Sequence, residues 1–194
     1  MLFSKVTKNG YGYLKDKVRV EAIKTVLLLL IPATFIIVSK VLGGTKGKWL
    51  MFIAVMCLIP AGNELVSLIM ACKGKNKGCD ISLYNRIIKI NENEAVPVLY
   101  DLYFTSYEKN YPVQALVCVN KGIVGYSNQE NFDHKKFEEH INTMLSQNKL
   151  SAASIKIFDN EDKFVERVEM LGKVPKTAED VDNSILRLMM NLTI

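Results

Sequence analysis

Two apolar runs near the N-terminus limit what this chain can fold into. Residues 25–42 carry a single charge, Lys40, and residues 49–71 carry a single charge, Glu64. A helix needs about 20 residues to cross the hydrocarbon of a bilayer, so each run is long enough to span it. The segment between them, residues 43–48, holds three glycines and is too short for a domain. This pattern predicts a transmembrane hairpin of two antiparallel helices joined by a tight turn.

Two alternatives to the hairpin remain open. The first run could be a signal peptide, since a basic segment precedes it, but it is long for one and no clear small-residue cleavage site precedes Gly43. Both runs could instead be buried helices of a soluble protein. That would require a core on all sides of them, because they are apolar all round. The remaining residues look committed to a domain of their own.

The net charge of +5 is concentrated beside the apolar runs. Residues 1–24 carry a net charge of +4, residues 72–80 carry +2, and residues 81–194 carry −3. Because positive residues stay on the cytoplasmic side, both termini are expected in the cytoplasm, with the chain in the cell membrane. The mildly acidic C-terminal part argues against nucleic-acid binding, which would place Lys and Arg on the domain itself.

These charges divide the chain into four predicted parts. A basic cytoplasmic segment, 1–24, precedes the hairpin, 25–71, and a basic juxtamembrane linker, 72–79, leads to a cytosolic domain, 80–194. In the linker, Lys73, Lys75 and Lys77 are candidate contacts for anionic lipid. Cys72 and Cys79 flank this basic stretch, and one of them could carry a reversible palmitoyl group, although two spans already anchor the chain and a pair of free thiols is favoured.

Each run has a proline near its middle, Pro32 and Pro60. A proline inside a helix removes one hydrogen bond and bends the helix, so two facing kinks are expected in the hairpin.

The second run also contains Gly62, Asn63 and Glu64, the most informative residues in the chain. A charged carboxylate near the bilayer centre costs at least about 2.5 kcal/mol, so it usually faces protein or water. Gly62 would permit close helix approach, and Asn63 could hydrogen-bond between helices. The three residues could form an intramembrane polar seam between chains, an ion or proton site, or only a packing contact within the hairpin.

The cytosolic part is predicted to be a small α/β (α+β) domain with the order α-β-β-β-α-β-α-α. Asp80 is placed to cap the first helix, Asp133 the second, with Phe132 and Phe137 as a hydrophobic staple, and Asn160 the third. Thr177-Ala-Glu-Asp180 resembles a capping box for the last helix. Residues 91–94 are predicted to end the first helix, residues 107–112 to form a loop, and Asn120-Lys121 a hairpin turn. The predicted strands are 98–105, 114–119, 122–126 and 154–158.

This order resembles the core of restriction-endonuclease-like folds. That resemblance implies a metal-binding Asp and a Glu-x-Lys on the second and third strands, and 114–119 and 122–126 contain neither. The whole chain also resembles uncharacterised bacterial two-span membrane proteins with a small cytosolic domain. Besides the basic N-terminus and paired spans, that resemblance is carried by Leu99-Tyr-Asp101, Thr105-Ser-Tyr-Glu-Lys109 and Lys156-Ile-Phe158. It implies no activity.

No residue pattern indicates catalysis, a cofactor or a metal. His134 and His140 fall on different faces of one predicted helix and are expected to be solvated. Asp101 is the best single acid, but it has no identifiable partner base and is expected to face solvent. Asp159-Asn-Glu-Asp162 lacks the spacing of a calcium loop and is better explained by helix capping.

The sequence therefore favours a non-enzymatic, membrane-anchored binding, scaffold or regulatory domain. Its expected partners are membrane lipids and either a second copy or another protein, with no nucleic acid and no cofactor. One alternative is an enzyme, or a degenerate restriction-endonuclease-like fold, tethered to the membrane. Another is a small oligomeric membrane conduit built around Glu64.

Overall fold

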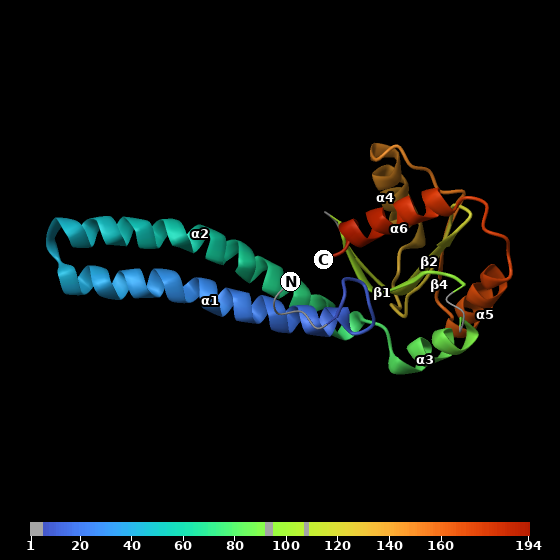
Figure 1. Cartoon of the computed structure of the whole chain (residues 1–194), viewed down its shortest axis with the longest axis horizontal. Coiled ribbons are helices and arrows are strands. Elements are labelled where there is room, and N and C mark those ends of the chain that lie inside the picture. Colours follow the sequence, from blue (N-terminus) through green and yellow to red (C-terminus); the bar gives the residue numbers. More distant parts are fainter. Residues whose placement is uncertain (1–5, 92–94, 107–108) are drawn as a thin grey trace. The chain divides into compact units, whose positions relative to one another are not determined.

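The two apolar runs and the mixed C-terminal sequence fold as separate parts of the chain. The computed structural model describes residues 6–91, 95–106 and 109–194 (Figure 1). Within these, residues 15–75 form one compact unit, and residues 6–14 with 76–194 form another. Lys5, residues 92–94 of the predicted helix end and residues 107–108 of the predicted loop and of the family resemblance lie outside the described residues.

The first unit is a hairpin of two long helices, α1 (Tyr13–Leu42) and α2 (Gly44–Gly74) (Figure 1). Only Gly43 separates them, so the predicted six-residue turn is wrong. Gly43 and Gly44 both take positive φ, 58° and 56°, and these two left-handed residues reverse the chain. Residues 45–48 are then free to be helical. At the other end, α1 starts within the predicted basic segment.

Small residues line the seam between the two helices. Gly47, Ala54 and Ala61 of α2 are buried and repeat every heptad. A Cβ on Gly47 would lie 2.6 Å from the backbone oxygen of Ser39, so the backbones approach too closely there for any side chain. Heptad steps from this contact pair Pro32 with Ala54 and Thr25 with Ala61, and these residues are also buried. The helices therefore pack on backbone and small side chains.

The large apolar side chains of the hairpin point away from this seam. Only 17% of the apolar window of α1 and 11% of that of α2 is buried. Trp49 is 70% exposed and Val66 61%. Pro32 lies in the seam and Pro60 is exposed, so the two prolines do not face one another as expected. Each helix continues through its proline. Both are long and apolar enough to cross a membrane.

The close approach at Gly47 makes a testable prediction. Gly47→Val should lower the free energy of unfolding of the full chain in detergent by about 1–3 kcal/mol, because the new side chain must push the helices apart. Gly62→Val is the matched control, since nothing lies within 4 Å of a Cβ at Gly62. Equal losses for the two variants would contradict the seam.

The second unit is built on a four-stranded mixed sheet in the order β1-β2-β3-β4. The strands β1, β2 and β3 pair antiparallel, whereas β4 pairs parallel with β3. The predicted order of helices and strands is confirmed. The element bounds are α3 Ile81–Ile90, β1 Val98–Thr105, β2 Asn110–Val119, β3 Gly122–Tyr126, α4 His134–Gln147, β4 Ser154–Phe158, α5 Glu161–Gly172 and α6 Glu179–Leu192.

Helices cover both faces of this sheet, and each face has its own core (Figure 1). On one face, Phe137 of α4 and Ile185 of α6 pack with Leu116. On the other, Leu83 of α3 and Phe164 of α5 pack with Val117. From Ala115 to Val119, successive residues of β2 enter opposite cores, as strand geometry requires, and the alternation shifts at Gln114, because Val113 packs in the same core as Leu116. Residues 115–119 of β2 are buried on both sides of the sheet and are all apolar, whereas the buried Gln114 before them is polar.

Two predicted helix caps are confirmed and two are wrong. The side chains of Asp133 and Asn160 accept hydrogen bonds from the backbone of Lys136 and Lys163. The staple is present, with the Phe132 and Phe137 rings 5.3 Å apart. Asp80 precedes α3 without a side-chain cap bond. The predicted capping box fails because Asn120 takes the Thr177 hydroxyl at 3.0 Å.

The turn between β2 and β3 confirms a prediction and reveals a buried acid. Asn120 and Lys121 take positive φ of 50° and 64°. Asp182 of α6 is buried and accepts hydrogen bonds from both of their backbone N–H groups, at 2.7 and 2.6 Å.

The predicted loop 107–112 is wrong at its end, because β2 starts at Asn110. Pro112 is tolerated in β2 because β3 pairs only from Ala115 onward.

Residues 6–14 pack into the second unit although they are far from it in sequence. The Asn9 carbonyl accepts a hydrogen bond from Tyr100 at 2.8 Å, and the Asn9 side chain bonds to Thr193 at 3.1 Å. Tyr11 stacks on Tyr84 with ring centroids 4.2 Å apart. The segment before the hairpin is therefore part of the same fold as the segment after it.

Candidate functional site

The hairpin holds a cluster of charges around Glu64. The side chain of Glu64 interacts with that of Glu21, which is buried on α1. One oxygen of Glu21 accepts from Lys24 at 3.2 Å and lies 3.9 Å from Lys17. The other oxygen is buried and meets no hydrogen-bond donor.

This charge cluster gives Glu64 a partner within its own chain. Gly62 and Asn63, predicted with it as a seam between chains, are exposed, and Gly62 makes no close helix approach within the chain. The sequence does not predict a role for Glu21, because it lies before the first run and contributes there only as one charge. Its heptad relation to Leu14 and Leu28 could have placed it on the buried stripe.

The basic residues after the second run are available to solvent. Lys73 closes α2, and Lys75 and Lys77 lie in a short 3-10 helix, Lys75–Lys77, and all three are exposed. Contact with anionic lipid stays a prediction. Cys72 is exposed and Cys79 buried. Burial, with the negative charges of Asp101 and Asp80 nearby, raises the pKa of the Cys79 thiol to about 12, so it is unreactive near neutral pH.

Asp101 is buried, not solvent-facing, which corrects the sequence expectation. It is 2% exposed and takes a φ of 55° inside β1. One carboxylate oxygen accepts from the backbone N–H of Cys79 at 2.6 Å, and the other accepts from that of Leu14 at 3.3 Å. Opposite it on β2, Gln114 donates to the Gly78 carbonyl at 3.0 Å. We call these five residues the Asp101 cluster.

The Asp101 cluster holds backbone in place and leaves little room for chemistry. A Cβ on Gly78 would lie 2.7 Å from a carboxylate oxygen of Asp101, so only glycine fits there. Leu14 belongs to the first turn of α1, where the helix dipole favours a negative charge. The left-handed conformation turns Asp101 out of the β1–β2 ladder, where its register partner would be Gln114. Asp tolerates the left-handed conformation better than most residues, and this preference is the one sequence signal for the conformation of Asp101.

Removal of the Asp101 carboxylate should destabilise the second unit. Asp101→Ala loses two hydrogen bonds to a charged acceptor, each contributing about 1.5–3 kcal/mol, so we expect a loss of at least about 3 kcal/mol in unfolding free energy. Chemical unfolding of the full chain in detergent measures it. Asp162→Ala is the control, since that side chain is 79% exposed and its ion pair should contribute less than about 1 kcal/mol. A loss for Asp101→Ala no larger than the control would contradict the structural role.

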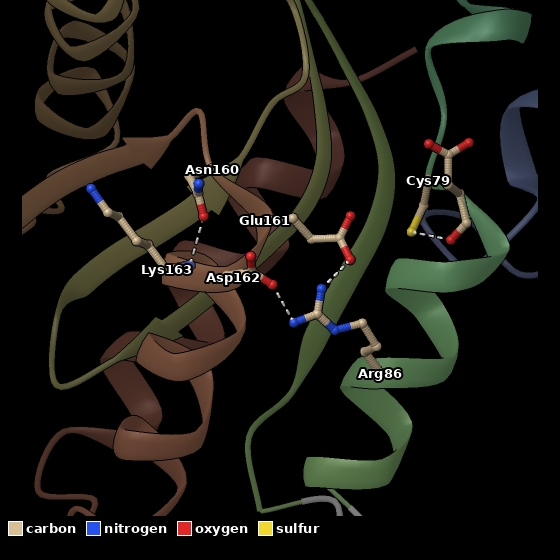
Figure 2. A network of polar contacts seen from close by, with 7 residues as sticks. Cys79, Arg86, Asn160, Glu161, Asp162 and Lys163 are labelled. Carbon is tan, nitrogen blue, oxygen red and sulfur yellow. Dashed lines mark hydrogen bonds and ion pairs between the residues drawn. The ribbon is translucent and has the colours of Figure 1, made fainter.

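The acidic run after β4 is used for packing between α3 and α5 (Figure 2). Arg86 of α3 binds Glu161 at 2.7 Å and Asp162 at 2.6 Å, with one nitrogen for each carboxylate. Asn160 caps α5 in the same view, beside them. These residues do not converge on a site for a cation.

No catalytic constellation forms among the described residues. The predicted solvated His134 is exposed and pairs with Asp159 at 3.1 Å, while partial burial lowers the pKa of His140. No group of three or more His, Cys, Asp or Glu side chains in the described part of the chain is placed to hold a metal ion. The second acid, Asp182, is occupied by backbone amides, as Asp101 is.

Two clefts open on the second unit. One, of about 500 Å³, is lined by Tyr84, Ile88, Asn91, Val96, Pro97, Val98 and Tyr100. Burial raises the pKa of the Tyr100 hydroxyl far above its usual value, so this residue stays neutral. The other, of about 420 Å³, is wholly polar and is lined by Asn76, Lys77, Asn128, Gln129, Glu130 and Asn131. Each of these two clefts is a concave surface on which a ligand could be bound.

Comparison with known proteins finds no matching family model, no matching curated protein and no matching solved structure.

Proposed function

We propose that this protein is a membrane-anchored binding module, in which the hairpin of α1 and α2 spans the bilayer and the second unit is the binding part. The observation that carries the proposal is the apolar surface of the hairpin. Most of the large apolar side chains in its two apolar runs are exposed and none is buried, along two helices of 30 and 31 residues. Such a surface is unstable in water and is stable in lipid.

The hairpin geometry also fits a bilayer better than the alternatives. A helix of a soluble core would be covered on most sides, and these helices are covered only along a narrow seam. The seam itself resembles membrane packing, where small residues allow close backbone contact. Basic residues on both flanks favour a cytoplasmic location for the second unit and for both termini.

Binding is favoured over catalysis by what the polar residues of the second unit do. Its two buried acids, Asp101 and Asp182, hold backbone amides, and neither cleft joins an acid to a base in a reactive pair. The tethered-enzyme alternative has support only from the element order, since β2 and β3 lack the acids and lysine that a nuclease-like site needs.

Membrane topology tests this proposal directly. We expect the full chain to stay with membranes after alkaline extraction, and reporters at either terminus to be active only in the cytoplasm. The double variant Leu30→Lys with Ile59→Lys places a charge in each span, so it should be released from membranes by alkaline extraction. The paired surface substitutions Met170→Lys and Val174→Lys are the control. A released wild-type chain, or a reporter active outside the cytoplasm, would contradict the proposal.

A conduit built around Glu64 is a second candidate, favoured by the carboxyl pair of Glu21 and Glu64. As a packing contact, Glu64→Gln should keep the hairpin or oligomer nearly intact, and Glu64→Leu should weaken it by about 0.6–2 kcal/mol. As an ion or proton site, either substitution should abolish flux, because neither side chain titrates. Oligomer size in detergent and ion flux in liposomes measure both. Wild-type protein without flux would exclude the conduit, and an unchanged oligomer in Glu64→Leu would exclude a seam between chains.

A further inference from the structure

The polar cleft of the second unit has an unusual lining, and we call it the amide cleft. Four of its six lining residues carry a carboxamide, one carries a positive charge and one a negative charge: Asn76, Asn128, Gln129, Asn131, Lys77 and Glu130. Carboxamides both donate and accept hydrogen bonds. The cleft therefore suits a small, strongly polar ligand that carries little net charge.

The two charges in the amide cleft are not used by the fold. The side chains of Lys77 and Glu130 form no ion pair or hydrogen bond with any described residue, and they do not pair with each other. A ligand with one anionic and one cationic group would meet a partner at both. A ligand with one charge only would leave the other side chain unmatched.

Gln129 points to a hydrogen-bond donor on that ligand. Its side-chain oxygen Oε1 is buried and has no hydrogen-bond partner. An unpaired buried acceptor costs about 1–3 kcal/mol. The terminal torsion of glutamine is broad, so a small rotation can turn this oxygen toward a donor in the cleft. An ammonium group with N–H bonds is such a donor, whereas a quaternary ammonium is not.

The wall that carries Gln129 is fixed by the fold. The Gln129 carbonyl accepts from the backbone of Phe132 at 3.2 Å, and Ser127 donates to the Pro112 carbonyl at 2.7 Å. At the far end, Lys109 donates to the Asn131 carbonyl at 2.6 Å. Binding in the amide cleft would therefore need little ordering of the loop.

The opposite wall of the amide cleft follows the second apolar run closely in sequence. Asn76 and Lys77 follow the apolar run 49–71 at once, and Lys77 is roughly 9 Å beyond Ala71 if measured along a helix. We propose that the amide cleft binds a phosphoethanolamine group, with Lys77 on the phosphate and Glu130 and Gln129 on the ammonium. If the group belongs to a lipid, this inference rests on the proposed function. If it belongs to a soluble phosphodiester, the inference is independent of that function.

A soluble headgroup tests the site without a membrane. We expect glycerophosphoethanolamine to bind the full chain in detergent, and to shift the NMR signal of the Gln129 side-chain amide. Glycerophosphocholine, which lacks N–H donors, and inorganic phosphate should bind at least about tenfold more weakly. Equal binding of all three probes, or none of glycerophosphoethanolamine, would overturn the proposal.

Charge variants distinguish specific binding in the amide cleft from non-specific electrostatic attraction. Lys77→Met should weaken glycerophosphoethanolamine by about tenfold or more, whereas Lys75→Met, the same change two residues away and outside the cleft, should leave it unchanged. Glu130→Gln should remove the preference over glycerophosphocholine. Equal effects of Lys77→Met and Lys75→Met would overturn the proposal.

Nanodiscs distinguish whether the phosphoethanolamine group belongs to a lipid or to a soluble compound. If it belongs to a lipid, adding phosphatidylethanolamine to phosphatidylcholine nanodiscs should shift the Gln129 signal and compete with the soluble probe. Soluble binding without this competition assigns the site to a free phosphodiester. Failure of the chain to enter nanodiscs while the soluble probe binds would contradict the proposed function and leave the site supported.

Discussion

The apolar surface that the hairpin leaves uncovered is the constraint on which the rest of this protein depends. α1 and α2 pack on Gly47, Ala54 and Ala61, so their seam is narrow and their large side chains face outward. Water would oppose this arrangement, because each large apolar side chain left exposed forgoes about 1.5–3 kcal/mol of burial. Lipid would favour it. The proposed membrane location follows from this one property, and so does the need for a second unit that folds on its own cores.

The second unit meets that need by gathering chain segments from both sides of the hairpin. Asp101 accepts from Leu14, which begins α1, and from Cys79, which follows α2. Tyr11 stacks on Tyr84 across the same two segments. A buried carboxylate is costly unless it is fully hydrogen-bonded, so this cluster is stable only when both segments are in place. The fold therefore couples its N-terminal segment to its sheet through a polar contact, not through apolar burial alone.

Strongly periodic elements were predictable from the sequence. Strand β1 and the order of the eight elements after the hairpin follow from the spacing of apolar residues, which changes between the two-residue period of strands and the longer period of helices. The caps at Asp133 and Asn160 are local, and local signals suffice for them. The capping box at Thr177 failed because Asn120, distant in sequence, competes for the same hydroxyl. Glu21 and Asp101 were missed for the same kind of reason, since each is buried by partners that no local pattern names.

The amide cleft was not predictable for a related reason. Asn76 and Lys77 follow the hairpin in the chain, and Asn128 to Asn131 come from the loop after β3, so only the fold of the second unit brings them together. Lys77 had been assigned to lipid by charge alone. Lys77 lines the same cleft as Glu130, and the proposal of a headgroup with both charges rests on that shared lining.

Depth measurement tests the central claim that the exposed surface of the hairpin lies in lipid. Spin labels at Leu30 and Ile59, placed in a full chain whose own cysteines are replaced and reconstituted in liposomes, report their access to oxygen and to a water-soluble nickel complex. We expect high oxygen access and low nickel access at both positions, and the reverse at Met170 on α5. High nickel access at Leu30 and Ile59 would contradict it.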